Sequence, residues 1–217
     1  MDRSLLSMYD LTGKVAIVTG ASRGLGVNFA RGLAKAGCDL VIASRNFESL
    51  KKVAKDLRKY GHKVISFKVD VTVAEDVKKM VEETISTFKK IDILVNNAGI
   101  ATVVSAEDMS KEEWQSVMDT NVTGVFLCAQ QVGRHMLKQG YGKIINVASQ
   151  YGIVASSYVA QISYVASKSA VLGLTRELAQ LPQLDREIEV FLNSPTAETL
   201  YLGEFFFSFF EKRQNSD

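Results

Sequence analysis

The chain has 217 residues, 47% of them hydrophobic, and 26 basic against 24 acidic side chains give a net charge of +2. This composition is typical of a globular domain with a hydrophobic core, and such a mild charge gives no support for nucleic acid or an anionic membrane as a partner. No apolar run approaches the ~20 residues of a membrane span, and the first twelve residues lack the apolar core of a signal peptide. Two isolated cysteines and two isolated histidines offer neither a disulfide framework nor a metal site, which predicts a cytoplasmic chain.

Short runs rich in β-branched residues alternate along the chain with longer segments of helical periodicity. In chain order, the predicted strands are Lys14–Thr19, Asp39–Ser44, Lys63–Val69, Asp92–Asn96, Lys143–Ala148 and Ile188–Asn193. The predicted helices between them are Gly24–Ala36, Phe47–Tyr60, Ala74–Phe88, Lys111–Lys138 and Ser163–Leu181. Such alternation predicts a single α/β domain over residues 1–217, with a Rossmann-type, doubly wound parallel sheet and helices on both faces.

A glycine-rich turn follows the first predicted strand, with the sequence Thr19-Gly20-Ala21-Ser22-Arg23-Gly24-Leu25-Gly26. Glycines at such a turn allow the backbone to approach a phosphate closely, and the free N–H groups of the following helix bind a pyrophosphate. A bare glycine turn without a ligand has the same local sequence, but the position at the first strand–helix junction favours a dinucleotide.

The spacing of this turn resembles that of the short-chain dehydrogenase/reductase family. Further marks of the family follow in the same order, on the expected elements: Asn96-Asn97-Ala98-Gly99, Asn121, Ser149 and Tyr164-Val165-Ala166-Ser167-Lys168. The resemblance covers residues 11–199 and is greatest to members of the gluconate 5-dehydrogenase and 3-oxoacyl-carrier-protein reductase types. It implies an NAD(P)-dependent oxidoreductase that acts on a small ketone or alcohol, such as a sugar acid, a polyol or a 3-oxoacyl compound.

The second predicted strand ends in Ser44-Arg45-Asn46, without the acidic residue that holds the ribose of NAD. An arginine matches the geometry of a 2′-phosphate, so Arg45 and Arg23 favour NADP(H), with NAD(H) as the alternative. Surface arginines without a ligand are the other interpretation. The resemblance adds Asp70 and Val71 at the adenine, and Asn97, Ala98 and Gly99 along the cofactor.

Tyr164 and Lys168 are four residues apart on a predicted helix and so share a face. An ammonium group near a phenol favours the ionised phenol, which can exchange a proton with a substrate oxygen during hydride transfer. By resemblance, Ser149 binds that oxygen, Lys168 also binds the nicotinamide ribose, and Asn121 supports a water chain that reaches Lys168. The segment between Ser149 and Tyr164 is longer than is usual in the family.

Within this longer segment, Gln150, Tyr151 and Gln161 are candidates for hydrogen bonds to a polyhydroxy substrate, or are simply solvated. The family pattern then weakens, because Thr196 follows Pro195 where a glycine is expected, although Thr199 still matches a threonine that contacts the carboxamide. Residues 200–217 diverge and include Phe205-Phe206-Phe207-Ser208-Phe209-Phe210. We therefore expect the last strand and the helices that cover the substrate to be missing. The alternative function is that of a truncated, non-catalytic NADP(H)-binding or interaction protein.

The resemblance implies at least a homodimer or homotetramer, formed in part by the helices at 111–138 and 163–181. The other partner expected is a small ketone or alcohol substrate, with no nucleic acid and no membrane.

Overall fold

The computed structural model describes residues 9–156, 159–180 and 187–193. Its strands are β1 (Val15–Thr19), β2 (Asp39–Ser44), β3 (Val64–Lys68), β4 (Ile93–Asn96), β5 (Tyr141–Val147) and β6 (Glu187–Asn193). Its α-helices are α2 (Leu25–Lys35), α3 (Phe47–Leu57), α4 (Ala74–Phe88), α5 (Lys111–Met118), α6 (Gly124–Gln139) and α7 (Ile162–Gln180). Three shorter turns of helix are η1 (Arg58–Tyr60), η2 (Asp119–Thr123) and η3 (Gln150–Gly152).

All described strands pair in parallel in the order β3-β2-β1-β4-β5-β6. This order, with a helical crossover between consecutive strands, is that of a Rossmann fold, and it confirms the predicted fold class. Pro195, Thr199 and residues 200–217 lie outside the described residues.

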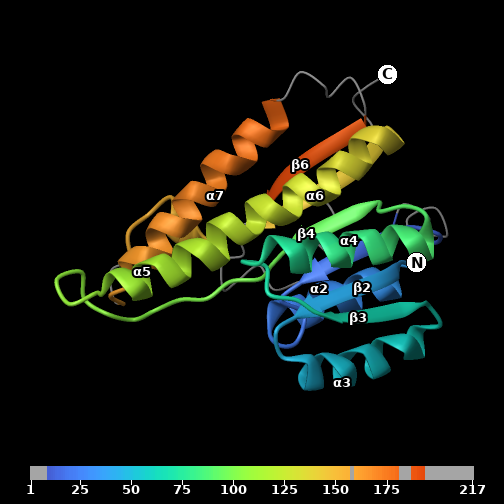
Figure 1. Cartoon of the computed structure of the whole chain (residues 1–217), viewed down its shortest axis with the longest axis horizontal. Coiled ribbons are helices and arrows are strands. Elements are labelled where there is room, and N and C mark those ends of the chain that lie inside the picture. The colour runs from blue at the N-terminus through green and yellow to red at the C-terminus, as the bar shows by residue number, and fades with distance from the viewer. Residues whose placement is uncertain (1–8, 157–158, 181–186, 194–217) are drawn as a thin grey trace.

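The sheet is buried on both faces, as its continuous apolar strands predict. Alternate residues of β1 enter different cores: Ala16 and Val18 pack on the side of α2 and α3, whereas Ile17 packs on the side of α4 and α6. Figure 1 shows α3 below the sheet, and α5 and α6 as one long rod with α7 beside it. No helix in the described ranges is long and apolar enough to cross a membrane.

The long rod differs from the single helix predicted at 111–138. Five residues, Asp119–Thr123, form a turn of π-helix between α5 and α6. One extra residue in a helical turn is seen frequently at functional sites, and apolar periodicity does not reveal it. The rod begins at Ser110, whose side chain forms a capping box with Glu113. It ends before Gly140, whose φ of 76° belongs to a left-handed helix cap.

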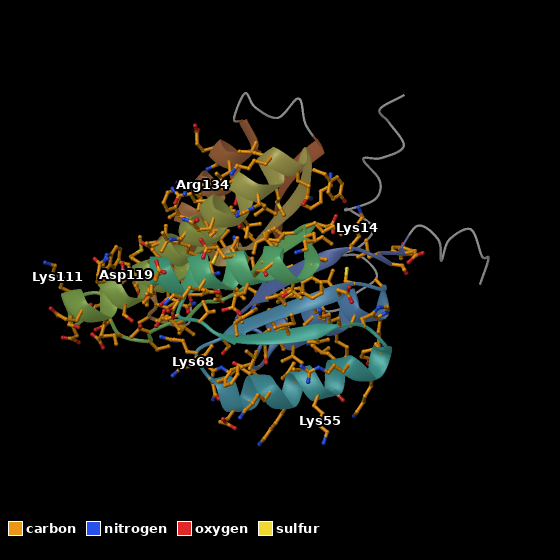
Figure 2. The ribbon with its side chains drawn as sticks, turned by 45° about the vertical axis from the view of Figure 1, so that its right-hand side comes forward. Lys14, Lys55, Lys68, Lys111, Asp119 and Arg134 are labelled. Carbon is orange, nitrogen blue, oxygen red and sulfur yellow. The ribbon has the colours of Figure 1, made fainter. Side chains whose placement is uncertain are left out.

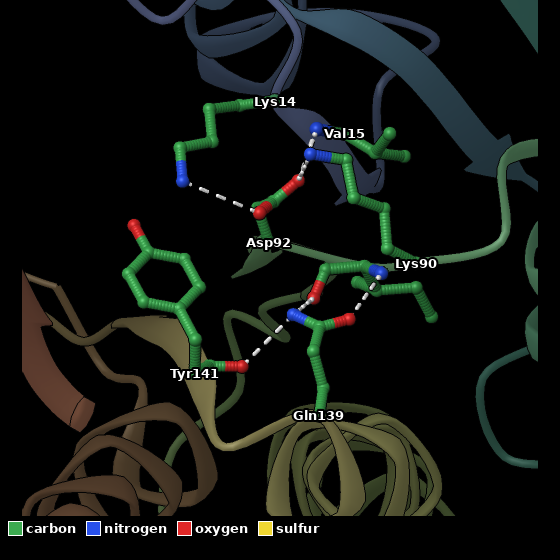
Figure 3. Close-up of polar contacts among 7 residues, drawn as sticks. Lys14, Val15, Lys90, Asp92, Gln139 and Tyr141 are labelled. Atoms are coloured by element: carbon green, nitrogen blue, oxygen red, sulfur yellow. Dashed lines mark hydrogen bonds and ion pairs between the residues drawn. The ribbon is translucent and has the colours of Figure 1, made fainter. Parts of the chain in front are cut away.

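At the amino ends of the strands, a buried carboxylate joins the first and fourth strands (Figure 3). Asp92 accepts a hydrogen bond of 2.8 Å from the backbone N–H of Val15, and its carboxylate lies 3.0 Å from the amine of Lys90 and 3.5 Å from that of Lys14. The Lys14 amine also lies 4.1 Å from the centroid of the Tyr141 ring. This cluster holds β1, β4 and β5 together at the edge opposite the glycine-rich turn, so it serves the fold.

Candidate active site

The glycine-rich turn leaves β1 at Thr19 and enters α2 at Leu25, as predicted. Gly20 has a φ of 67°, and a Cβ there would lie 2.8 Å from the backbone of Ala98. A Cβ on Gly26 would collide with the carbonyl oxygen of Gly20. Both positions therefore require glycine, because the turn packs directly against other backbone.

Gly24 differs from the other two glycines of the turn. Its φ is 60°, and a Cβ there would meet open space. Gly24 is also the N-cap of α2, with no side chain capping the helix and no acidic residue in its first turn. The first N–H groups and the positive end of the helix dipole therefore face an open position, which suits an anionic group.

The segment that follows β4 is hydrogen-bonded to this turn. The hydroxyl of Thr19 accepts hydrogen bonds of 3.1 Å from the backbone N–H groups of Asn97 and Ala98. The side-chain amide of Asn97 donates to the carbonyl oxygen of Thr19 at 2.9 Å. The motif at residues 96–99 is thus hydrogen-bonded to the glycine-rich turn. It also places Gly99 near Asn121.

The end of β2 also meets the glycine-rich turn. The hydroxyl of Ser44 donates to that of Ser22 at 2.8 Å, and the Asn46 side chain caps α3 by accepting from the N–H of Ser49. Arg45 is 59% exposed and lies only within a loose ion-pair distance, 3.9 Å, of Asp70. Its guanidinium is therefore accessible to a ligand at this edge of the sheet. Val71 is buried next to Asp70.

An open cleft of about 450 Å³ lies beside Arg45. The other residues that line it come from the segment after β3 and from the rod: Thr72, Lys111, Glu112, Gln115, Ser116, Asp119 and Thr120. Arg45 and Lys111 give this cleft two cationic side chains. Arg23, which belongs to the glycine-rich turn, is also exposed.

Asn121 lies within the π-helical turn and is completely buried. Its side-chain oxygen accepts from the N–H of Ile100 at 2.8 Å, and its amide donates to the carbonyl oxygen of Ile100 at 2.9 Å. The same amide donates to the hydroxyl of Ser167 at 2.9 Å, and that hydroxyl donates to the carbonyl oxygen of Tyr164. Asn121 therefore connects the loop after β4 to the helix that carries Tyr164 and Lys168.

The predicted catalytic residues Ser149, Tyr164 and Lys168 lie where β5 ends and α7 begins. The amine of Lys168 lies 5.6 Å from the centroid of the Tyr164 ring. Ser149 follows β5 and is 9% exposed, and its hydroxyl accepts a hydrogen bond of 3.3 Å from the N–H of Tyr151. Close packing fixes this arrangement, because a Cβ on Gly152 would lie 2.9 Å from the Lys168 carbonyl oxygen.

Lys168 is an unusual lysine, because only 5% of it is exposed. Its amine donates a hydrogen bond of 2.6 Å to the carbonyl oxygen of Val147, and no ion pair joins it to a carboxylate in the described ranges. Burial lowers the pKa of this amine to about 8. A buried, unpaired cation beside a phenol is costly to keep and is typical of a functional site.

The three predicted substrate contacts lie on the loop after Ser149. Gln150 is exposed and Tyr151 is half-buried. The side-chain amide of Gln161 donates to the hydroxyl of Ser156 at 3.1 Å. Gln150 and Tyr151 belong to η3, whereas Gln161 directly precedes α7.

A buried polar chain that the sequence did not reveal connects the sheet to α7. Asn96 donates to the side chain of Asn146 at 2.9 Å, and Asn146 donates to the hydroxyl of Thr175 at 3.0 Å. Thr175 lies two turns after Lys168 on the same helix face, and this spacing of seven residues is the only sequence signal that could have indicated its role. These hydrogen bonds hold α7 against β5 next to Val147, the hydrogen-bond acceptor of Lys168.

Within the described residues, no group of three or more His, Cys, Asp or Glu side chains could hold a metal ion.

Comparison with known proteins agrees with this geometry. The family model for short chain dehydrogenase matches residues 14–197. The chain is 42% identical over 176 residues to the 2-dehydro-3-deoxy-D-gluconate 5-dehydrogenase of Dickeya dadantii, covering 81% of this chain and 68% of that protein. It is 37% identical over 196 residues to the NAD-dependent glycerol dehydrogenase of Listeria innocua, covering 90% and 75%.

The fold is also similar to that of a solved structure. A short-chain type dehydrogenase/reductase from Mycobacterium marinum superimposes with a TM-score of 0.85 at 39% identity, over 88% of this chain and 75% of that one. The matched region contains the glycine-rich turn and the Ser149, Tyr164 and Lys168 group. The chain therefore belongs to the short-chain dehydrogenase family and is an NAD(P)-dependent oxidoreductase that acts on CH–OH groups.

Proposed function

We propose that the chain transfers a hydride between NADP(H) and a ketone or secondary alcohol. The observation that carries this proposal is the buried amine of Lys168, held 5.6 Å from the Tyr164 ring centroid and hydrogen-bonded to Val147, two residues before Ser149. The amine is an internal cation with no carboxylate partner in the described ranges, so its field acts on the phenol through a medium of low dielectric constant.

The glycine-rich turn fits a dinucleotide. Gly20 and Gly26 have no room for a side chain, and Gly24 presents an uncapped helix end to open space. The N–H groups there would hold the pyrophosphate, and Asp70, Val71 and the segment 97–99 would line the rest of the cofactor. When bound, the nicotinamide supplies or accepts the hydride.

In the proposed mechanism, the protein positions one oxygen atom of the substrate. The Ser149 hydroxyl would donate a hydrogen bond to this oxygen, and the Tyr164 hydroxyl would give it a proton in reduction or take the proton in oxidation. Lys168 would stabilise the ionised phenol by its charge. Asn121 and Ser167 hold Tyr164 in place through the hydrogen bonds described above.

The preference for NADP(H) rests on the end of β2. Arg45 is exposed and only loosely paired with Asp70, and Arg23 is exposed on the turn. The end of β2, Ser44-Arg45-Asn46, carries no acidic side chain, and the side chain of Asn46 caps α3. An arginine fork matches a 2′-phosphate, whereas an acidic side chain would repel it.

We also propose a dimer or tetramer formed through α5, α6 and α7. Phe126 lies on the α5–α6 rod and is 42% exposed, which places a large apolar side chain on the surface expected to be buried between copies. Light scattering after gel filtration tests this assembly. A protein that stays monomeric at micromolar concentration contradicts it.

The buried, unpaired Cys38 and Cys128 support the cytoplasmic location expected from the sequence.

The test of the function combines binding with turnover. Titration with NADPH and NADH, followed by fluorescence, should show tighter binding of NADPH, and addition of a panel of ketones should then consume NADPH. Tyr164→Phe should keep the binding and reduce turnover by roughly 10²-fold or more. Binding without turnover in the parent chain would support the non-catalytic alternative, and no binding of either cofactor would refute the proposal.

A further inference from the structure

Two loops flank the proposed active site, and we call their described residues, 100–105, 150–156 and 159–161, the mouth loops. They follow neighbouring strands, β4 and β5, at the edge of the sheet where Ser149 and Tyr164 lie. The N–H of Val104 donates to the carbonyl oxygen of Ala160 at 3.0 Å, within a parallel bridge between Val104 and Gln161. The described parts of the two loops therefore form one joined surface.

Large apolar side chains concentrate on this surface. Eight large hydrophobic residues are exposed in the described part of the chain, and five of them lie on the mouth loops or on the first residue of α7: Val103, Ile153, Val154, Val159 and Ile162. Ile153 is 74% exposed and Val103 is 66% exposed. Single exposed apolar residues are ordinary, but a group of them beside a reaction centre indicates a binding surface.

The mouth loops also lack charge. Their sequences, Ile100-Ala-Thr-Val-Val-Ser105, Gln150-Tyr-Gly-Ile-Val-Ala-Ser156 and Val159-Ala-Gln161, contain no acidic or basic side chain. The amine of Lys168 is buried and bonded to a carbonyl oxygen, and Lys111 lies at the outer end of α5 (Figure 2), where it lines the cleft beside Arg45. The loops therefore offer no cation to the carboxylate of a sugar acid.

We infer that the substrate is an uncharged ketone or secondary alcohol with an apolar chain or ring, which lies on the mouth loops while its oxygen lies at Tyr164 and Ser149. This inference rests on the proposed function and narrows its substrate class. A charged or polyhydroxy group would lose its hydration against Val103, Ile153 and Val154 without new partners, whereas an alkyl group gains from leaving water. The apolar surface adjoins the reaction centre, because Ser149 directly precedes the second loop and Gly152 of that loop packs against the backbone of Lys168, which favours the substrate over a second copy of the chain as its occupant.

A series of 2-ketones from butanone to decanone tests the inference, with 5-keto-gluconate and fructose as the anionic and polyhydroxy comparison compounds. With NADPH, kcat/KM should rise by about three- to fourfold for each added methylene until the alkyl chain extends past the loops. The double variant Ile153→Ser with Val154→Ser should flatten this dependence. Tyr60→Ser, an exposed apolar residue at the opposite edge of the sheet, should leave it unchanged. Calorimetric binding of the matching 2-alkanols in the presence of NADPH, which cannot accept a hydride, provides the same dependence without turnover.

Several outcomes would overturn the inference. Faster reduction of 5-keto-gluconate or fructose than of every alkyl ketone would do so, as would a methylene dependence that the double variant leaves intact. In these cases cofactor binding and turnover persist, so the proposed function stands. If the double variant changes the molecular mass in solution and not the methylene dependence, the surface binds another copy of the chain and the inference is wrong. A chain that binds neither cofactor refutes the proposed function itself.

Discussion

The buried amine of Lys168 should give folding a pH dependence that can be measured by difference. Burial lowers its pKa from 10.5 to about 8, which corresponds to roughly 3 kcal/mol of folding free energy. Because the folded pKa is the lower one, the unfolded chain binds more protons between these two values. The free energy of unfolding should therefore rise with pH in this window. Below about pH 8, folding should carry the whole cost of burying the charged amine.

Lys168→Met isolates this contribution, since methionine is similarly long and carries no charge. Urea unfolding of both proteins, followed by circular dichroism at about pH 7 and about pH 9.5, should show the parent chain gaining roughly 2 kcal/mol relative to the variant. Other titrating groups are common to both chains and cancel in the difference. Lys138→Met changes an exposed lysine on α6 and should give a difference that does not vary with pH.

A constant difference between the parent chain and Lys168→Met would refute the reasoning, because it would mean that the amine has the same pKa in the folded and unfolded chains. Lys168 would then be solvated in solution, and its charge could not act on Tyr164 through a dry site. The expected result would instead show that the fold gives up stability to keep a cation next to the phenol, as functional sites commonly do.

Three further variants test the rest of the site. Thr175→Val removes the hydrogen bond from Asn146 and should lower the free energy of unfolding in urea by about 1–3 kcal/mol. It should also reduce kcat more than it changes KM, whereas Thr175→Ser should retain the stability and the kcat of the parent chain. Gly26→Ala should abolish NADPH binding in a fluorescence titration, because its Cβ would collide with a backbone carbonyl, whereas Gly133→Ala on α6, which meets open space, should bind normally. Arg45→Ala should raise the Kd for NADPH by roughly tenfold and leave that for NADH unchanged; equal effects on both would contradict the proposed role of Arg45.

Much of the fold could be predicted from the sequence, because its signals are local. The β-branched runs at 15–19 and 39–44 and the helical periodicity at 74–88 gave elements close to those observed. The glycine-rich turn was predictable for the same reason, since only glycine tolerates the backbone of Gly20 and the contact at Gly26. The spacing of Tyr164 and Lys168 on one helix also follows from helical geometry alone.

Other features were decided by tertiary structure. The π-helical turn interrupts a segment whose apolar pattern predicts one regular helix, and it places Asn121 where it bonds to Ile100 and Ser167. Those partners are 21 and 46 residues away along the chain, so no local pattern indicates them. The low pKa of Lys168 arises from burial, which depends on how α7 packs against β5.

The sequence by itself determined which elements form, in what order, and which residue types can bind a phosphate or move a proton. Only the tertiary structure decided that the Lys168 amine is buried and hydrogen-bonded to the carbonyl oxygen of Val147. It also decided that the mouth loops join at Val104 and Ala160 to form one uncharged surface. The physical reason is range: propensity and periodicity act within a few turns of chain, whereas desolvation and surface character arise from segments that meet only when the sheet is complete.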